Sequence, residues 1–387
     1  MNVVYVLSST SSSGGATKSF LAMLHGVMAE GVRPIIVVPD KNELYHLLTD
    51  MNLNVFQTSY RVNTYPWTET PYDILLYLPR LIARRILNWR STRMLYDYLK
   101  DKHIDIIHTN VSVIDIGFRT ARKLHIPHIY HIREYIDWDF HLKLYPCKNS
   151  LQRSLGKELS YSICITKAIQ HHHLQSNKAT SIVIYNAISE ERSDNFSIGS
   201  REYLLFAGRI ETAKGLLELV EAYSMANIDI PLWIAGEIID KKYDLTIKSY
   251  IQRQGLSKKI LFLGLRNDIN ELMQHAKALI VPSHYEAFGR CMAEAMFNKC
   301  LVVGLNTGGT KEQFDNGLEL TGYEIGLRYN NTQELIVQLQ KACTMEKEEY
   351  HNYIENASVV VNKLYSTPSH VTKILNFYHD ILNKKCV

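Results

Sequence analysis

Short apolar runs alternate with amphipathic stretches along most of the chain, and this alternation predicts the fold class. The first run, VVYVLSS at 3–9, is followed at 17–31 by apolar residues at helical spacing, closed by Gly31 where a helix C-cap glycine belongs. Buried strands that alternate with helices predict parallel sheets covered by helices on both faces. Comparable runs recur at 34–40, 104–110, 128–134, 161–166 and 181–186, then at 203–208, 231–237, 259–264, 278–283 and 300–304.

A polar stretch near the middle of the chain divides this pattern into two series. Residues 187–202, AISEERSDNFSIGSRE, lack the apolar periodicity of their flanks and predict an interdomain linker. At 387 residues the chain has room for two domains that each bury a core. We therefore expect a doubly wound, Rossmann-like α/β domain at 1–186, a linker at 187–201, a second such domain at 202–365 and a separate C-terminal helix at 366–387.

Composition places the chain among globular proteins and narrows its partners. Apolar residues make up 46% and charged residues 21% of the sequence, and the net charge of +4 is too small to indicate nucleic-acid binding. The six cysteines form no C-x-x-C pair and no metal-ligand spacing, which is typical of reduced thiols. No apolar run reaches about 18 residues and the first residues lack the basic start of a signal peptide, so we expect a cytoplasmic protein.

The densest chemical signal is the segment 206–215, FAGRIETAKG. It places Arg209 and Lys214 five residues apart, between a strand end and a helix start. Because a helix N-terminus and two cations attract the same charge, this pattern favours a diphosphate site. A solvated loop with ordinary surface charges is the alternative.

Two later segments add carboxylates and glycines at strand ends. In 282–296, PSHYEAFGRCMAEAM, Glu286 follows a strand, and Glu294 lies eight residues further on, within a helix. Such carboxylates can accept hydrogen bonds from sugar and ribose hydroxyls, although Glu294 can also be a helix-surface charge. Gly289 allows close approach to a helix N-terminus, and Gly308 and Gly309 of NTGGTKEQF expose backbone amides.

These segments together resemble the retaining glycosyltransferases of family 4. The resemblance rests on AGRIETAKG, LWIAGE, ILFLG, PSHYEAFG with an E-x7-E spacing, and NTGGTKE, in this order over about 120 residues. The first half resembles the family more loosely, through its Ser/Gly loop, DIIHTN, HIYHIRE, ICIT and VIYNAI. The resemblance implies the GT-B fold, in which two Rossmann-like domains face each other across a cleft and the C-terminal helix returns to the first domain.

The resemblance also implies a role for each matching residue. Arg209 and Lys214 would hold the diphosphate of a nucleotide-sugar donor, and Glu294 its ribose hydroxyls. Glu286 and His131 would lie beside the donor sugar near the reacting carbon. Further donor contacts are implied at Gly14, Gly15, Phe288, Gly289, Gly308, Gly309 and Glu312.

Some positions depart from known patterns. The segment 8–19, SSTSSSGGATKS, lacks the glycines that a G-x-x-x-x-G-K-[ST] loop needs at 12 and 17, so we expect it to face phosphate through backbone amides instead. Ala287 and Arg290 differ from the residues that are frequent in the family. Arg290 is either a third cation for the diphosphate or the partner of a carboxylate.

Several features outside the donor motifs have competing interpretations. His108 at a strand end and Arg133 beside His131 are acceptor candidates, or buried residues whose partners lie within the protein. DWD at 137–139 mimics a metal-binding D-x-D motif, and HHH at 171–173 a metal site. Solvated carboxylates and a surface run of histidines are the readings we favour for these two.

The segment 72–98 combines five arginines with leucine, isoleucine, tryptophan and tyrosine. A basic amphipathic helix of this type can lie on an anionic membrane. Alternatively, its apolar side packs into the core and its arginines face water. We favour membrane contact, because lipid-linked acceptors are common in the family that the chain resembles.

With the resemblance, we expect a retaining, metal-independent hexosyltransferase, retention being what the resemblance implies. It would use a UDP- or GDP-sugar, no further cofactor, and a saccharide or lipid-linked acceptor in cell-surface polysaccharide or glycolipid synthesis. A nucleotide-sugar epimerase of the same fold and a non-catalytic nucleotide-sugar-binding protein remain as alternatives. A dinucleotide oxidoreductase is disfavoured, because no G-x-G-x-x-G follows the first strand.

Overall fold

The computed structural model describes residues 1–8, 15–66, 68, 70–188 and 201–385. The chain divides into two compact units: unit 1 comprises Met1–Ala187 and Thr367–Val387, and unit 2 comprises Ile188–Ser366. Residues 189–200, the greater part of the linker expected at 187–201, lie outside the described residues.

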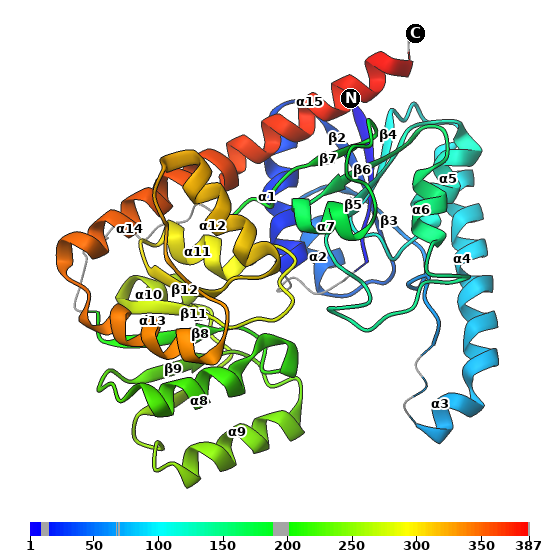
Figure 1. Cartoon of the computed structure of the whole chain (residues 1–387). Coiled ribbons are helices and arrows are strands. Elements are labelled where there is room, and N and C mark those ends of the chain that lie inside the picture. The colour runs from blue at the N-terminus through cyan, green and yellow to red at the C-terminus, as the bar shows by residue number, and fades with distance from the viewer. Residues whose placement is uncertain (9–14, 67, 69, 189–200, 386–387) are drawn as a thin grey trace. The chain divides into compact units, whose positions relative to one another are not determined.

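Unit 1 contains a parallel sheet of seven strands in the order β3-β2-β1-β4-β5-β6-β7 (Figure 1). The strands are β1 (Asn2–Val6), β2 (Arg33–Val38), β3 (Asn54–Gln57), β4 (Ile106–Thr109), β5 (His128–Ile132), β6 (Ser160–Cys164) and β7 (Ser181–Val183). The helices are α1 (Gly15–Ala29), α2 (Glu43–Asp50), α3 (Pro71–Leu75), α4 (Tyr77–Leu99), α5 (Ile116–Leu124), α6 (Ser150–Leu155), α7 (Lys167–His172) and α15 (Thr367–Lys385).

Helices cover both faces of this sheet, as the buried runs of the sequence predict. Val3 and Tyr5 of β1 belong to an apolar cluster that includes residues of α1 and α15. The next residue along, Val6, points to the opposite face, where it contacts Gly117 of α5. Gly117 is required there, because a Cβ at this position would lie 2.2 Å from Oγ1 of Thr109.

Unit 2 contains a parallel sheet of six strands in the order β10-β9-β8-β11-β12-β13. The strands are β8 (Tyr203–Ala207), β9 (Leu232–Ala235), β10 (Ile260–Gly264), β11 (Ala276–Val281), β12 (Leu301–Leu305) and β13 (Leu327–Tyr329). The helical segments are η1 (Thr212–Lys214), α8 (Leu216–Ala226), α9 (Lys241–Arg253), α10 (Ile269–His275), α11 (Arg290–Phe297), α12 (Gly308–Thr321), α13 (Thr332–Thr344), α14 (Lys347–Val360) and η2 (Val361–Tyr365).

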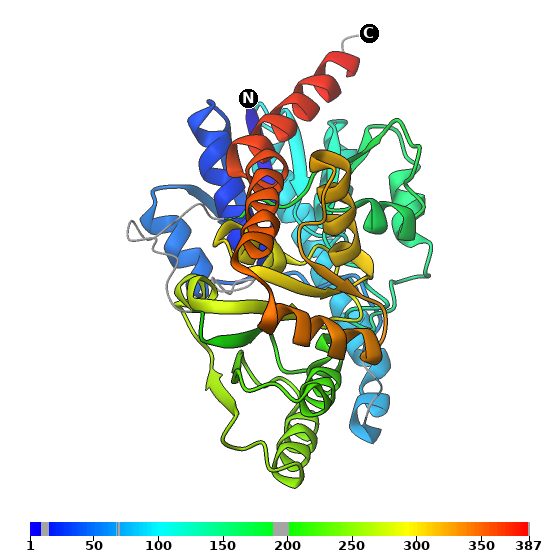
Figure 2. The ribbon, with the colours of Figure 1, turned by 60° about the vertical axis from the view of Figure 1, so that its left-hand side comes forward.

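The last helix, α15, belongs to unit 1 although all of unit 2 precedes it in the sequence. It runs beside α1 in both views (Figures 1 and 2). Ile374, Tyr378 and Ile381 are fully buried in the same cluster as Phe20 of α1. The helix begins at Thr367, within one residue of the start expected at 366.

Candidate functional site

In doubly wound sheets, ligands bind at the carboxyl ends of the strands, at the point where the strand order reverses. In unit 2 this point lies between β8 and β11, which are adjacent strands whose connections leave in opposite directions. The segments that follow these two strands contain Arg209, Lys214 and Glu286. The segment after β12, the next strand, begins α12 with Gly308 and Gly309.

Lys214 and Glu286 form an ion pair at this point. The Nζ atom of Lys214 lies 2.8 Å from Oε2 of Glu286, and the side chains are only 21% and 17% exposed. Burial opposes both charges, but the pairing outweighs it, so the pKa of Glu286 is lowered and that of Lys214 is raised. The carboxylate is therefore ionised and the amine protonated at neutral pH.

Arg209 is the exposed cation of the group. Its Nη2 atom lies 2.8 Å from Oε1 of Glu211, and about half of its side chain is accessible. Gly215, at the end of η1, has a φ of +67°, and a Cβ there would lie 2.2 Å from the carbonyl oxygen of Pro282. This close approach brings the segment after β8 against the segment after β11.

Backbone contacts join the segments after β11 and β12 in the same way. The amide of Gly309 donates a hydrogen bond of 2.6 Å to the carbonyl oxygen of Glu286. A Cβ on Gly309 would lie 2.6 Å from the backbone of Phe288, so only glycine fits. The two segments are thereby held together beside the Lys214–Glu286 pair.

Gly289 is the N-cap of α11 and lies in the left-handed region, with a φ of +85°. A Cβ at this position would lie 2.9 Å from Nε2 of Gln313 and 3.3 Å from Cγ of Glu286. Nε2 of Gln313 donates hydrogen bonds to the carbonyl oxygens of Phe288 and Gly289. Gln313 thus fixes the turn that carries Glu286, a role that sequence reasoning missed because its signal is a contact between distant segments.

Glu294 is held by Arg290, four residues earlier on α11. The Nε atom of Arg290 lies 2.7 Å from Oε1 of Glu294, and both side chains are largely buried. Of the two interpretations of Arg290, the structure therefore favours the partner of a carboxylate. The i, i+4 spacing was a signal for this pair in the sequence.

The remaining donor candidates of unit 2 lie in or beside the same segments. The ring of Phe288 is buried and meets the ring of Tyr365 edge to face at 5.3 Å, so the side chain serves the core. Gly308 begins α12 with a φ of +51°, and Glu312 is a buried residue of the first turns of that helix. What Phe288 can present to a ligand is its backbone.

In unit 1, His131 and His108 are fully buried neighbours. Nε2 of His108 lies 3.1 Å from Nδ1 of His131, and Nδ1 of His108 lies 2.6 Å from the hydroxyl of Tyr378 on α15. Burial and the Arg133 guanidinium lower the pKa of both histidines, which are therefore neutral at pH 7. Within the described residues, Nε2 of His131 has no hydrogen-bond partner.

Arg133 connects His131 to two asparagines. Its guanidinium donates to Oδ1 of Asn110 at 3.0 and 3.1 Å, to Asn186 and, at 3.3 Å, to Nδ1 of His131. The donation from Arg133 leaves the imidazole proton of His131 on Nε2. His131, Arg133 and His108 thus form one buried network, in which sequence reasoning missed both asparagines.

The first loop is only partly described. Gly15 begins α1, whereas Gly14 and the rest of 9–14 lie outside the described residues. The expectation that this loop faces phosphate stays a prediction.

The DWD and HHH segments contact each other. Asp137 lies 2.8 Å from Nε2 of His172, and Asp139 accepts the backbone amides of Tyr135 and Ile136. His173 is buried, with Nε2 2.8 Å from the carbonyl oxygen of Glu134, so the expected surface run of histidines is wrong at this residue. Across the described residues, no group of three or more His, Cys, Asp or Glu is placed to hold a metal ion.

The arginine-rich segment exposes its apolar residues. Leu78, Ile82 and Ile86 recur every four residues along α4 and are 64%, 56% and 52% exposed, and Trp89 continues the stripe at 58%. The buried residues of α4 all lie from Asn88 onwards. The first turns of α4 therefore do not pack their apolar side into the core, which was the alternative interpretation of this segment. Figure 1 shows α3 and the start of α4 extending away from the sheet of unit 1.

Two protein-family models match adjacent parts of the chain. Glycosyltransferase Family 4 matches residues 13–192, and Glycosyl transferases group 1 matches residues 187–360. Together the two matches extend from residue 13 to residue 360.

Individual proteins of known name resemble the chain over part of its length. An uncharacterized glycosyltransferase of Methanocaldococcus jannaschii is 27% identical over 223 residues, which are 55% of this chain and 59% of that protein. The N-acetyl-alpha-D-glucosaminyl L-malate synthase of Bacillus anthracis is 25% identical over 187 residues, 47% of this chain and 46% of that enzyme. The chain thus spans about half the length of these relatives.

A solved structure matches over nearly the whole length. HepE of Anabaena in complex with UDP has a TM-score of 0.76 at 18% identity, over 98% of this chain and 100% of that one. Another structure of HepE contains UDP-glucose. At this identity the likeness shows the fold, and it confirms the expected two-domain α/β GT-B architecture.

Proposed function

Since the chain belongs to the glycosyltransferases of group 1 and family 4, we propose that it transfers a hexosyl unit from a nucleotide-diphosphate sugar with retention of configuration. The observation that carries this proposal is the convergence of three segments at the point where the strand order of unit 2 reverses. There, the charged pair of Lys214 and Glu286 lies beside glycine-rich turns. A backbone hydrogen bond from Gly309 to Glu286 holds these turns together.

The cations of this group suit the charge that develops during transfer. The bond between the anomeric carbon and the diphosphate oxygen breaks, and its electron pair leaves with the nucleotide diphosphate. Arg209 and Lys214 would neutralise that charge, which is the kind of electrostatic stabilisation that contributes most to many enzymes. With two protein cations available, we propose that no metal ion is required.

The acceptor hydroxyl supplies the new bond. Its oxygen attacks the anomeric carbon from the side that the diphosphate leaves, and its proton passes to an oxygen of the departing phosphate. This scheme needs no general acid from the protein. It agrees with Glu286, because a carboxyl group that is ionised at neutral pH cannot donate a proton and can accept hydrogen bonds from sugar hydroxyls.

Glu294 and His131 complete the proposed donor contacts. Arg290 donates a hydrogen bond to Oε1 of Glu294 and so orients its carboxylate. We propose that this carboxylate accepts hydrogen bonds from the ribose hydroxyls. The Nε2–H group of His131 is a donor suited to a sugar hydroxyl, but it is fully buried. Direct contact would therefore require the surrounding residues to open.

We propose UDP as the nucleotide of the donor. The support is that HepE, whose fold this chain shares over nearly its full length, was solved with UDP and with UDP-glucose. The experiment that tests this is thermal unfolding of the full chain with UDP, GDP and ADP and with their glucose esters. Binding raises the melting temperature by mass action, so an unchanged melting temperature with every nucleotide would contradict the proposal.

Product analysis separates transfer from the alternative chemistries. An epimerase converts the sugar nucleotide when no acceptor is present, whereas a transferase releases UDP in proportion to the acceptor glycosylated. A binding protein without catalysis does neither.

We further propose that the acceptor is attached to an anionic membrane that unit 1 contacts through α3 and α4, in cell-surface polysaccharide or glycolipid synthesis. The support is the exposed stripe of Leu78, Ile82, Ile86 and Trp89 next to arginines, a combination that water does not favour and an anionic lipid surface does. Such contact is peripheral: among the described residues no helix is long and apolar enough to cross a membrane.

A further inference from the structure

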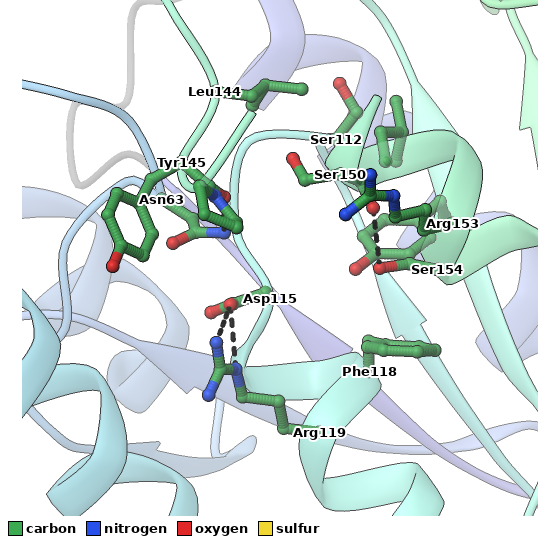
Figure 3. A pocket seen from close by; sticks show the side chains of 13 residues that line it. Asn63, Ser112, Asp115, Phe118, Arg119, Leu144, Tyr145, Ser150, Arg153 and Ser154 are labelled. Atoms are coloured by element: carbon green, nitrogen blue, oxygen red, sulfur yellow. Dashed lines mark hydrogen bonds and ion pairs between the residues drawn. The ribbon is translucent and has the colours of Figure 1, made fainter. Parts of the chain in front are cut away.

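Unit 1 contains a cavity of about 230 Å³ that none of the donor residues lines. It lies between the segment 144–146, the start of α5, and α6 (Figure 3). Pockets that bury a drug-sized ligand measure about 300–1,000 Å³, so this one suits a single sugar ring.

One wall of the cavity carries a carboxylate with an unused oxygen. Asp115 is 8% exposed, and its Oδ2 atom accepts a hydrogen bond of 2.7 Å from Nε of Arg119 and lies 2.7 Å from Nη2 of the same guanidinium. Its Oδ1 atom is buried and has no hydrogen-bond partner among the residues that the structure describes. Figure 3 shows this carboxylate on the side of the space where Asn63 and Tyr145 lie, with Arg153 on the opposite side.

Across the space lies a cation without a counter-charge. No ion pair involves Arg153 among the described residues, and its guanidinium points into the cavity (Figure 3). Ser150 and Ser154 of the same helix add hydroxyl groups to this wall. A buried, unsatisfied acceptor that faces donors is suited to a ligand rich in hydroxyl groups.

Aromatic rings form further surfaces of the cavity. Phe118, Tyr130 and Tyr145 all line it. The Arg85 guanidinium lies over the Tyr145 ring, 4.6 Å from its centre, in a cation–π contact that holds the ring in place. Aromatic faces pack against the C–H faces of sugar rings, while carboxylates, amides and guanidinium groups bind sugar hydroxyls.

A second hollow adjoins the first and adds positive charge. Asn63, Arg119 and Tyr145 line both hollows. The second is also lined by Arg84 and Arg85, so the two together present four arginines (84, 85, 119 and 153) and one acid, Asp115, a formal excess of three positive charges. This excess favours a ligand with a phosphate or carboxylate group.

We propose that this cavity binds a sugar unit that carries a phosphate or carboxylate group. Its ring packs against Tyr145 and Phe118, a hydroxyl donates to Oδ1 of Asp115, and its anionic group meets Arg153. None of the donor residues of unit 2 lines this cavity. If the proposed function is correct, this sugar unit is part of the acceptor. That identification rests on the proposed function, whereas the existence of the binding site does not.

Calorimetric titration of the full chain tests this inference, with excess UDP present so that a donor site cannot take up the probes. The probes are glucose 1-phosphate, glucuronate, neutral glucose and inorganic phosphate. We expect glucose 1-phosphate and glucuronate to bind at least tenfold more tightly than glucose or inorganic phosphate. Equal affinity for glucose 1-phosphate and inorganic phosphate would overturn the sugar site and leave only an anion site.

Two variants locate the binding. Arg153→Gln and Asp115→Asn should each weaken glucuronate binding at least tenfold. Lys157→Gln, which removes an exposed positive charge just after α6, should leave it unchanged. Thermal unfolding checks that Asp115→Asn still folds. Arg153 is exposed, so Arg153→Gln should fold normally, and its binding result holds even if Asp115→Asn does not fold. Unchanged affinity in Arg153→Gln would overturn the site.

The same titrations separate this inference from the proposed function. UDP binding without sugar-acid binding would remove the inference and leave the transferase. Sugar-acid binding by a chain that binds no nucleotide would contradict the proposed transferase function and leave the inference about the cavity standing.

Discussion

Arg290 and Glu294 share one face of α11, with Nε of the arginine 2.7 Å from Oε1 of the glutamate. The pair orients the carboxylate of Glu294 through Oε1, so that Oε2 can accept a hydrogen bond from a ligand. In the proposed function that ligand is the donor ribose, so the geometry of the pair bears directly on nucleotide affinity.

Replacement of Glu294 tests this role. Glu294→Ala should raise the donor KM about tenfold or more, because hydrogen bonds to a charged group contribute about 1.5–3 kcal/mol, with kcat changed less. Arg290→Ala should raise the same KM by a smaller factor. Steady-state kinetics with varied donor measures both, and Arg253→Ala on the exposed end of α9 serves as the comparison. An unchanged KM in Glu294→Ala would contradict the ribose role.

Loss of either diphosphate cation should slow the chemical step. We expect Arg209→Ala and Lys214→Ala to lower kcat about 10²–10³-fold, as for other groups that stabilise charge in the transition state. Lys214→Ala also leaves Glu286 without its counter-charge, so thermal unfolding must accompany its kinetics. Lys242→Ala, an exposed lysine of α9, should retain full activity. Turnover near that of the unmodified chain in Arg209→Ala would refute the assignment of that residue.

Gly289 allows backbone strain to be separated from steric contact. Gly289→Ala and Gly255→Ala both place a side chain at positive φ, +85° and +69°, which costs about 1–2 kcal/mol of stability. A Cβ at 289 additionally meets Gln313 and Glu286, whereas nothing lies within 4 Å of one at 255. Urea unfolding should therefore show destabilisation in both variants, and donor kinetics should change only in Gly289→Ala. Equal activity of the two would argue against a role for the turn at 289.

Buried histidines make the stability of unit 1 depend on pH. Burial lowers the pKa of His128 to about 3, and those of His173 and His370 to about 4. The unfolded chain, where each pKa is about 6.5, binds more protons than the folded chain below that pH. Stability is therefore complete above about pH 6.5 and falls toward pH 4, by about 1.4 kcal/mol per pH unit for each such group.

Buried carboxyl groups with raised pKa values, Glu134 and Asp139, oppose this trend, and a histidine variant separates the two effects. Burial raises the pKa of Glu134 to about 7, so its protonation offsets part of the loss between pH 7 and 4.5. His370→Gln should flatten the pH dependence of urea unfolding between pH 6.5 and 4, whereas His379→Gln, exposed on the same helix, should not. Identical slopes for the two variants would contradict the assignment to buried histidines.

Exposure of the α4 stripe predicts binding to anionic vesicles. Sedimentation with phosphatidylglycerol vesicles should show binding that weakens at high salt, since arginines contribute to it. Leu78→Ser should reduce the bound fraction several-fold, because insertion of the side chain contributes about 1.5–3 kcal/mol. Leu245→Ser, at the same exposure of 64% on α9, should leave binding unchanged. Absence of binding at low salt would exclude membrane contact by this surface.

Apolar periodicity predicts most of the strands and the two-unit organisation of the sheets, because buried parallel strands require unbroken apolar runs. It does not predict β3 and β13, which are edge strands of four and three residues with few apolar positions. It also cannot separate a core-facing stripe from an exposed one: Leu78, Ile82 and Ile86 have the spacing of either.

The site could be predicted to the level of its segments but not of its pairs. Motif order places Arg209, Lys214 and Glu286 in loops after adjacent strands. That the lysine pairs with Glu286, and that Gln313 fixes the turn at Gly289, depends on side-chain contacts between segments far apart in the sequence. The cavity around Asp115 had no signal, because its walls come from five separate stretches of the chain.

Because α15 completes the core of unit 1, synthesis on the ribosome imposes an order on folding. Ile374 and Tyr378 are translated after the whole of unit 2. Unit 2 can therefore acquire its native structure first, while the earlier-made Phe20 and Leu24 still await the helix that covers them. Until α15 is made, the apolar surface of unit 1 around Phe20 stays exposed, and we expect chaperones to bind nascent unit 1 there.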